Sequence, residues 1–520
     1  MHLIIGSGIA SLNAAALLAR AGKKVLVLER NEWFGGNIRT RKDWFTGFKI
    51  DQFSGFHPLF TTSPTYKELK KELEAAGLEY LNTDLPTGVL LPDGRSAVFY
   101  RERAKTVEEL NRLHAGDGDH YREQMEQFGK RQKIVFGLLN NEIMSFDGLL
   151  LGMKAGWQLG GTDGILSFLG DALPTARKWL ENQFNSEVTR ALFAPWVLHT
   201  GLGPDDAASS LMNRVIFASF EQTGMPVPKG GGQQLAHALT KIIRDNGGEL
   251  RARTHVDEIL TDGKQVTGIR TGEGETIEAE TVLANVTPTQ LYGHLLRRAE
   301  VGKEVLKSTE NYRYGRGNMQ LHLVLSRPPA WPDERLLRTG IVHLTPGLNG
   351  VSRAVNEATR GLLPAEPTIV FGQHTALDPS RAPEGKWTVW IQLQELPNFP
   401  TGDALDEIDC NGEWTDTIAE QFADRVVAQI DRSVPGFADS VEGRRILSPA
   451  DLYRLNINLV NGDPYSGQAS LDQLFVFRPI PELRRHETPI EGLFHIGAST
   501  HPGPGLNGTS GHLVAKELGG

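Results

Sequence analysis

Apolar runs and glycine breaks alternate at the start of the chain in the order strand, turn, helix, strand. The apolar run HLII (residues 2–5) stops at Gly6-Ser7-Gly8. The alanine- and leucine-rich segment IASLNAAALLARAG follows and ends at Gly22, where glycine commonly terminates a helix. A second apolar run, KVLVLER, then reaches Glu29. This order predicts a βαβ unit whose two strands are buried in a parallel sheet.

The turn between the first strand and the helix has the chemistry of a dinucleotide site. Gly6 permits the tight turn, Gly8 lets the backbone approach a pyrophosphate, and the helix N-terminus offers free N–H groups. Glu29 lies 23 residues after Gly6, where a carboxylate can bind ribose hydroxyls. Ser11 replaces glycine at the third position of the usual fingerprint. A doubly wound sheet that binds no nucleotide is the alternative interpretation.

A literal G-x-G-x-x-G occurs far from this unit, at Gly503–Gly508. Only 12 residues follow it, too few for a return strand and a ribose-binding acid. We therefore expect a single dinucleotide site.

Two strands are marked by alternation of apolar and mostly polar residues in the second half of the chain, GNMQLHLVLS and TVWIQLQEL. An amphipathic helix follows over residues 418–430, so an antiparallel sheet backed by helices is expected. The polar faces of the strands either meet solvent or line a cavity. In the second case the site suits an oxygenated or nitrogenous substrate better than a bare hydrocarbon. The candidate cavity residues are Gln320, His322, Gln392, Gln394, Asn456 and Asn458.

Composition and charge exclude several classes of protein. The 520 residues carry a net charge of -9, which gives no basic surface for nucleic acid. The single cysteine, Cys410, excludes disulfides and thiolate metal cages. The first strand begins at His2, which leaves no room for a signal peptide, so we expect a cytoplasmic protein. The apolar tract Phe146 to Leu169 is broken by glycines and charges; buried helix is the favoured interpretation and peripheral membrane contact the alternative.

Three separated segments together resemble one known family. Just beyond the second strand come RNEWFGGNIRT, with the doublet Gly35-Gly36, and GFKIDQFSGFHPLF. The middle of the chain contains PVPKGGGQQLAHALTKIIRDNGGELRARTHVDEIL, and the last segment is EGLFHIGASTHPGPGLNGTSGHLVAKEL. These segments resemble FAD proteins of the phytoene desaturase and amine oxidase superfamily, most closely the phytoene dehydrogenase-like branch. The resemblance implies non-covalently bound FAD.

The resemblance also implies which residues hold the cofactor. The arginine of the family's GGR is Asn37 here, and Arg39 is the candidate to replace it. In relatives the backbone at the position of Val256 meets the adenine, and the closing segment meets the isoalloxazine ring beside a helix expected to start near Leu506. The expected cofactor residues are Gly6, Ser7, Gly8, Ile9, Ala10, Ser11, Glu29, Arg30, Gly35, Gly36, Asn37, Arg39, Ser54, Val256, Asn285, Gly497, Ala498, Gly505, Leu506 and Asn507.

The fold class that follows is α/β: a doubly wound, three-layer FAD-binding domain with an α+β substrate cap that contains an antiparallel sheet. Residues 1–96, 224–300 and 479–520 are expected to form the FAD-binding domain. Residues 97–223 are expected to form a helical cap lobe, and residues 301–478 a lobe of antiparallel sheet and helices.

The expected reaction is oxidation of a small molecule, in which a substrate C–H bond delivers hydride to the flavin and oxygen or a quinone takes the electrons. His57 is a candidate base, although packing is the favoured alternative, and His199 is a weaker one. His495, His501 and His512 lack carboxylates at ligand spacing, so no metal is expected. A redox-neutral isomerase, an amine oxidase and a flavin-free escort protein remain alternatives. The sequence leaves oligomeric state open.

Overall fold

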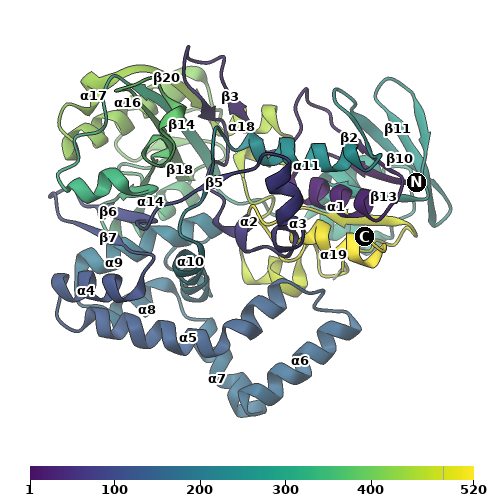
Figure 1. Ribbon diagram of the computed structural model, residues 1–520, viewed down its shortest axis with the longest axis horizontal. Coiled ribbons are helices and arrows are strands. Elements are labelled where there is room, and N and C mark those ends of the chain that lie inside the picture. The colour runs from purple at the N-terminus through teal and green to yellow at the C-terminus, as the bar shows by residue number, and fades with distance from the viewer. Residues whose placement is uncertain (484) are drawn as a thin grey trace.

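Five parallel strands form the centre of the lobe in which both chain termini lie (Figure 1). The computed structural model describes residues 1–483 and 485–520, with the side chains of residues 146, 147, 149, 151 and 158 left out. The strand order is β21 (Leu493–Ile496), β13 (Thr281–Asn285), β1 (His2–Ile5), β2 (Val25–Leu28) and β9 (Glu249–Arg251). The first and last segments of the chain thus meet in one sheet.

The two faces of this sheet are covered differently, because alternate residues of each strand point to opposite sides. Ile4, Val27 and Leu283 pack against the helical layer. Leu3 and Leu26 pack on the other side against the small antiparallel sheet. The helices are α1 (Ile9–Arg20), α11 (Gln233–Asp245) and α19 (Thr509–Glu517), and the antiparallel strands are β10 (Val256–Asp262), β11 (Gln265–Thr271) and β12 (Thr276–Glu278). The expected three-layer, doubly wound fold is confirmed.

A second, seven-stranded sheet forms the cap. Its order is β20 (Val441–Leu447), β14 (Gly317–Leu325), β18 (Trp387–Leu396), β17 (Ile369–Gly372), β15 (Ile341–Leu344), β6 (Thr87–Leu90) and β7 (Ser96–Phe99). All neighbours are antiparallel except β15 and β6. Helix α16 (Asp416–Ser433) packs Phe422 and Val426 against Leu321 and Leu323 of β14. Strands β6 and β7 belong to the cap sheet. Most of this hairpin lies within residues 1–96, which were expected to belong to the FAD-binding domain.

Helices make up most of the chain from residue 103 to residue 223, which follows β7 in the sequence. They are α4 (Arg103–Leu113), α5 (Asp117–Leu139), α6 (Phe146–Leu159), α7 (Thr162–Ala172), α8 (Ala176–Gln183), α9 (Glu187–Phe193) and α10 (Ser209–Thr223). Aromatic rings fill their common core; Phe193 packs against Phe217 with ring centroids 4.5 Å apart and stacks on Phe184 at 5.2 Å.

The tract Phe146 to Leu169 is helical, but its expected burial is wrong. Helices α6 and α7 form a hairpin that projects from the lower edge of the molecule (Figure 1). Trp157 is 83% exposed, Met153 65% and Leu166 61%. The glycines that break the tract, Gly160 and Gly161, make the turn between the two helices, both with positive φ. Within residues 1–483 and 485–520, no helix combines the length and apolarity needed to cross a membrane.

The remaining elements connect these layers. They are β3 (Thr40–Arg41), β4 (Ile50–Asp51), α2 (Pro58–Thr62), α3 (Pro64–Ala75), β5 (Tyr80–Leu81), η1 (Ala194–Thr200), β8 (Val227–Pro228), α12 (Pro288–Gln290), η2 (Leu291–Leu295), α13 (Lys303–Glu310), η3 (Glu334–Arg338), α14 (Leu348–Thr359), β16 (Leu362–Leu363), α15 (His374–Leu377), η4 (Pro379–Arg381), β19 (Gly402–Asp403), α17 (Phe437–Ser440), α18 (Pro449–Leu455), η5 (Val460–Gly462), η6 (Leu471–Gln473) and η7 (Phe475–Phe477).

Candidate active site

A cavity of about 330 Å³ lies between the carboxyl ends of the parallel strands and the cap sheet. Crevices at this edge of doubly wound sheets are where such folds bind dinucleotides. The expected cofactor residues that line it are Gly6, Ser7, Gly8, Ile9, Ala10, Glu29, Arg30, Gly35, Gly36, Asn37, Ser54, Val256, Asn285, Gly497, Ala498, Gly505, Leu506 and Asn507. They come from the beginning, the middle and the end of the chain, and the fold brings them together. Ser11 and Arg39 do not line the cavity.

The first turn keeps its backbone open toward the cavity. Gly6 has φ +83°, in the left-handed region that favours glycine. A Cβ on Gly8 would lie 2.9 Å from Asn285 Nδ2. That same Nδ2 donates to Ser11 Oγ at 2.9 Å, so Ser11 orients Asn285 from behind the cavity wall. The serine at the third fingerprint position therefore ties α1 to β13.

Glu29 is buried at the carboxyl end of β2, with 5% of its surface exposed. One carboxylate oxygen accepts hydrogen bonds from Ser7 N at 2.9 Å and Ser7 Oγ at 2.7 Å. The other accepts from Asn31 N at 2.8 Å. Each carboxylate oxygen has two lone pairs, so this arrangement fixes the group and still leaves acceptor capacity for a hydroxyl in the cavity.

The glycine doublet packs directly on the first turn. Gly35 N donates to Ser7 O at 3.1 Å, and a Cβ on Gly36 would lie 3.0 Å from Gly8 Cα. Asn37 lines the cavity, and its Oδ1 accepts a hydrogen bond from Asn456 Nδ2 at 2.8 Å. A side chain at Gly35 would also clash, because its Cβ would lie 2.7 Å from Ile38 O, so the close packing of this doublet on the turn requires glycine.

The expectation that Arg39 takes the place of the missing family arginine is not met by its geometry. Its guanidinium stacks on Trp33, 3.8 Å from the ring centroid, and pairs with Glu32 at 2.8 Å. Cation–π stacking and ion pairing together hold the side chain outside the cavity. Asn37, which does line the cavity, carries no charge with which to replace it.

The last segment closes the other end of the cofactor site. Gly497 has φ +109°, and a Cβ there would lie 2.2 Å from Asn285 Oδ1. Helix α19 begins at Thr509, three residues later than expected, because Gly508 adopts a left-handed conformation and Asn507 Oδ1 accepts from Thr509 N at 2.8 Å. Leu506 and Asn507 thus lie in the loop that precedes the helix. The small residues and free backbone of this loop suit a flat ring at the helix N-terminus.

His57 does not line the cavity. It lies at the start of α2, fully buried, with Nδ1 3.0 Å from Tyr80 Oη. Burial lowers the pKa of His57 to about 3, so the ring is neutral at pH 7. These contacts agree with a packing role for His57. Because His57 lies outside the cavity, its position does not support a role as catalytic base.

His199, which lies in η1 of the helical lobe, lines the cavity. Its Nε2 lies 3.1 Å from His343 Nε2, and its ring stacks on Trp196 at 4.3 Å between centroids. Burial lowers the pKa of His199 to about 3 and the pKa of His343 well below its ordinary value. Both rings are therefore neutral, and one N–H donates to the other ring nitrogen.

The polar strand faces of the cap are buried, so the solvent interpretation is wrong. Gln320, Gln392, Asn456 and Asn458 line the cavity. Gln394 lies just behind them and donates to Tyr465 Oη at 3.1 Å. His322 lies outside the cavity against Trp44, with 5.1 Å between ring centroids.

The lining residues that the sequence analysis did not single out include Asn318, Trp390 and Tyr465 on the cap side of the cavity. Asn318 precedes Gln320 by two residues and Trp390 precedes Gln392 by two, so the alternation that indicated the glutamines also points to them. Tyr465 lies in an irregular loop, where no periodicity could have indicated it.

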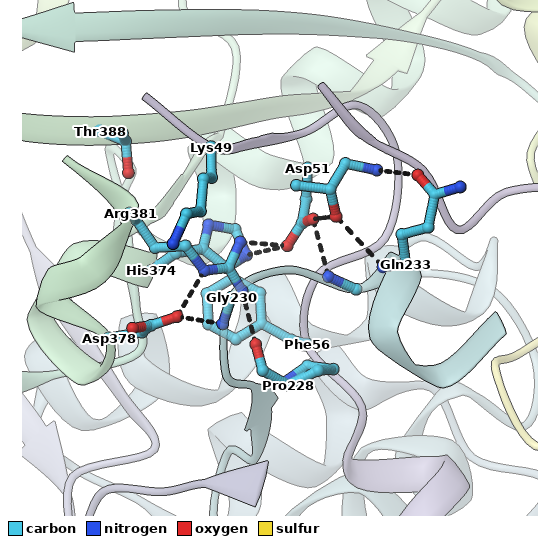
Figure 2. Close-up of polar contacts among 12 residues, drawn as sticks. Lys49, Asp51, Phe56, Pro228, Gly230, Gln233, His374, Asp378, Arg381 and Thr388 are labelled. Atoms are coloured by element: carbon cyan, nitrogen blue, oxygen red, sulfur yellow. Dashed lines mark hydrogen bonds and ion pairs between the residues drawn. The ribbon is translucent and has the colours of Figure 1, made fainter. Parts of the chain in front are cut away.

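A buried ionic network fixes one side of the site (Figure 2). Arg381, fully buried, binds Asp51 at 2.7 Å, Asp378 at 2.8 Å and the carbonyl of Pro228 at 2.8 Å. Burial acts to raise the pKa of Asp51, but the charges of Arg381 and His374 together with the hydrogen bonds from Thr40 and Arg381 lower the pKa overall. The network joins a strand of the first segment, the cap and the loop before α11.

The same network holds the backbone of the glycine loop before α11. Asp51 accepts from Gly232 N at 2.8 Å, and Asp378 accepts from Gly230 N at 2.6 Å (Figure 2). His374 stacks on Phe56 with ring centroids 4.2 Å apart. Asp51 and Phe56 bracket the residues Phe53 and Ser54, both of which line the cavity. The ion pairs therefore position the cavity wall from behind.

One group of potential metal ligands occurs among the described residues. His255, Asp257 and His294 bring ligand atoms within 4.8 Å of one another. Asp257 already pairs with Arg297 at 2.7 Å, and the group is partly open to solvent. We assign it no metal.

The fold and this glycine-lined cleft define the class: an FAD-dependent oxidoreductase. Comparison with known proteins agrees. The model of the family described as flavin containing amine oxidoreductase matches residues 9–391, and the chain belongs to that family. A limonene dehydrogenase subunit of Castellaniella defragrans is 25% identical over 99% of this chain and 94% of its own length. A neurosporene-forming phytoene desaturase of Rhodobacter capsulatus is 25% identical over 99% and 93%. The expected resemblance to phytoene desaturases is confirmed.

Solved structures share the fold. An oxidoreductase from Methanosarcina mazei superposes with a TM-score of 0.62 at 16% identity, over 99% of both chains. Putrescine oxidase superposes with a TM-score of 0.58 at 13% identity, over 99% of this chain and 98% of the other.

Proposed function

We propose that the protein dehydrogenates a hydrophobic or amphipathic small molecule at a C–H bond next to the flavin. One observation carries the proposal: a single cavity joins the glycine-lined cofactor residues to the inward face of the cap strands. Bound FAD supplies a two-electron acceptor. The similarity to a limonene dehydrogenase subunit and to phytoene desaturases supports this class of substrate.

The chain contributes binding, orientation and exclusion of water. We propose as FAD ligands the expected residues that line the cavity, with Glu29 on a ribose and the Gly497–Asn507 loop beside the flavin ring. The N-terminus of α19 carries partial positive charge, which favours negative charge that develops next to it. The apolar and amide side chains of the cap hold the substrate over the cofactor.

An anaerobic titration tests the proposal. Purified protein is loaded with FAD and mixed with a lipid extract or an aqueous metabolite extract while the visible spectrum is recorded. Bleaching of the flavin by either extract is the expected result. A protein that cannot be loaded with FAD would falsify the proposal and favour a binding module.

We also propose oxygen or a quinone as the electron acceptor. Among the described residues, the βαβ unit of β1, α1 and β2 carries the glycine-rich turn of a dinucleotide site, and that site is assigned to FAD. Stopped-flow reoxidation of the reduced protein with oxygen, with a soluble ubiquinone analogue and with NADP⁺ distinguishes the acceptors. Reoxidation by NADP⁺ alone contradicts the proposal.

Finally, we propose peripheral contact of the α6–α7 hairpin with a lipid surface. The exposed Trp157, Met153 and Leu166 support it, because apolar side chains gather there on a projecting element. The double substitution Trp157→Ser/Leu166→Ser is expected to lower co-sedimentation with phosphatidylglycerol–phosphatidylcholine vesicles at least five-fold. The control is Phe399→Ser, an exposed aromatic residue of the cap. Equal co-sedimentation of the two variants contradicts the proposal.

A further inference from the structure

The cap side of the cavity presents a surface of side-chain amides. Asn318 and Gln320 lie on β14, and Gln392 lies on β18 directly opposite Gln320. All three line the cavity, and we call them the amide wall. Asn318 is 1% exposed and Gln320 5%. Successive alternate residues of a strand share a face, which explains why the three amides converge.

The hydrogen bonds within this wall do not satisfy all of its polar atoms. Gln392 Nε2 donates to Asn318 Oδ1 at 2.7 Å. Asn318 Nδ2 and Gln320 Oε1 are buried without a partner among the described residues, as is Nε1 of the neighbouring Trp390. A buried polar group without a partner is destabilising, because it has lost its hydrogen bonds to water and gained none in return. Two donors and one acceptor on side chains that line the cavity therefore lack a hydrogen-bond partner within the described protein.

The charges around the cavity indicate which ligand could make them. Glu29 and Arg30 are the acidic and the basic side chain among the described residues that line the cavity. Both lie at the nucleotide end, beside β2. At the cap end, His199 is held neutral by burial, and the amides carry no charge. An ionised ligand group placed there would lose its hydration without gaining a counter-charge, which is costly. The site favours a neutral polar group.

Apolar surface completes the same part of the cavity. Trp390 belongs to the aromatic core of the cap and helical lobe, and Leu452 and Leu459 also line the cavity. A bare hydrocarbon would cover these side chains but leave the amides unpaired. A hydrocarbon skeleton that carries a hydroxyl, carbonyl or amide group would satisfy both kinds of surface.

We propose that the amide wall binds a neutral hydroxyl, carbonyl or amide group of the substrate, and that the substrate is an oxygenated or amide-bearing hydrophobic molecule. This inference rests on the proposed dehydrogenation, since it identifies the molecule that the cavity holds for that reaction. It departs from limonene, the hydrocarbon after which one relative is named.

Matched pairs of probes test the inference. Cyclohexane and cyclohexanol, limonene and carveol, and farnesene and farnesol are titrated into the FAD-loaded protein, and binding is followed by calorimetry and by the shift of the flavin spectrum. In at least one pair the alcohol is expected to bind at least 10-fold more tightly than the hydrocarbon, which corresponds to about 1.4 kcal/mol. Gln320→Leu is expected to remove this preference, while Gln222→Leu, an exposed glutamine, leaves it unchanged.

Each other outcome is decisive. If no alcohol binds better than its hydrocarbon in wild-type protein, the inference is wrong, whatever the variants do. If folded Gln320→Leu protein loses FAD, the amides serve the flavin and the inference is also wrong. If an alcohol binds with the expected preference but does not reduce the flavin under anaerobic conditions, the result supports the amide wall and contradicts the dehydrogenation. A hydrocarbon that bleaches the flavin with no preference for the alcohol supports dehydrogenation and overturns the amide wall.

Discussion

Among single residues, Glu29 offers the clearest test of how the protein binds FAD. Its carboxylate accepts three hydrogen bonds, from Ser7 N, Ser7 Oγ and Asn31 N. Glu29→Gln places an amide NH₂ against one of these donors, and a hydrogen bond to a charged group is worth about 1.5–3 kcal/mol. We expect FAD to bind at least 10-fold more weakly, measured by quenching of flavin fluorescence. Glu32→Gln, on an exposed ion pair, is the control; equal loss in both variants contradicts the assignment.

Gly497 gives a second prediction at this scale. Alanine there meets both a positive φ and Asn285 Oδ1 at 2.2 Å. Gly497→Ala is expected to abolish stable FAD binding and to lower the free energy of unfolding by about 1–3 kcal/mol. Gly129→Ala in α5 is the matched control, because nothing lies within 4 Å of its added Cβ. The yield of yellow protein after desalting measures the first effect, and urea unfolding the second. Normal flavin content in Gly497→Ala would show that the loop tolerates a side chain.

Local sequence indicated most of the residues that line the cofactor end, since glycine and glutamate there serve the backbone geometry of one turn. Arg39 and His57 illustrate where this reasoning stops. Their positions depend on Trp33 and Tyr80, side chains whose packing no local pattern encodes. A charged or titratable residue near a motif can point into the cofactor cavity or away from it. Tertiary contacts decide which of these two orientations the side chain adopts.

At the scale of elements, the contact between β4, the loop before α11 and the cap depends on the Arg381 network. Asp51→Asn leaves the buried guanidinium short of one carboxylate, and breaking a buried ion pair costs about 3–5 kcal/mol. We expect a loss of that size in urea unfolding, together with weaker FAD binding. The double variant Asp51→Asn/Arg381→Met is expected to recover part of the loss. Glu79→Gln, which breaks an exposed pair with Lys229, should change stability by less than about 1 kcal/mol. Equal effects of Asp51→Asn and Glu79→Gln would refute the positioning role.

Strand and helix patterns predicted the elements well where one face is buried. The alternation in β14 and β18 and the helical spacing in α16 meet in one core. The same periodicity could not show that β6 and β7 join the cap sheet, because pairing between distant strands leaves no local mark. It also could not show that α6 and α7 project outward, since an apolar helix looks the same in sequence whether or not something covers it.

At the scale of the whole molecule, buried histidines set the response to acid. Burial lowers the pKa of each of seven histidines below its ordinary value of 6.5: His57, His199, His322, His343, His374, His495 and His501. Because the unfolded chain binds these protons first, stability is lost as the pH falls below 6.5. The carboxylates with lowered pKa, such as Asp51, lose their contribution only below about pH 4, the unfolded value.

We therefore expect the melting temperature to fall steadily from pH 6.5 to pH 4.5, before the carboxylates titrate. Scanning calorimetry in buffers of constant ionic strength measures it. His322→Asn, which removes one buried imidazole whose pKa is about 3, should flatten the slope. A melting temperature that stays level over this range would contradict the histidine account.

The strand order of the parallel sheet also governs how the protein must be made. On the ribosome, β1 and α1 emerge about 490 residues before the edge strand β21 and helix α19 that complete their layers. The cofactor lobe cannot close until residues 493–517 have been synthesised. A premature stop codon in that stretch would therefore remove the flavin site as surely as one within β1.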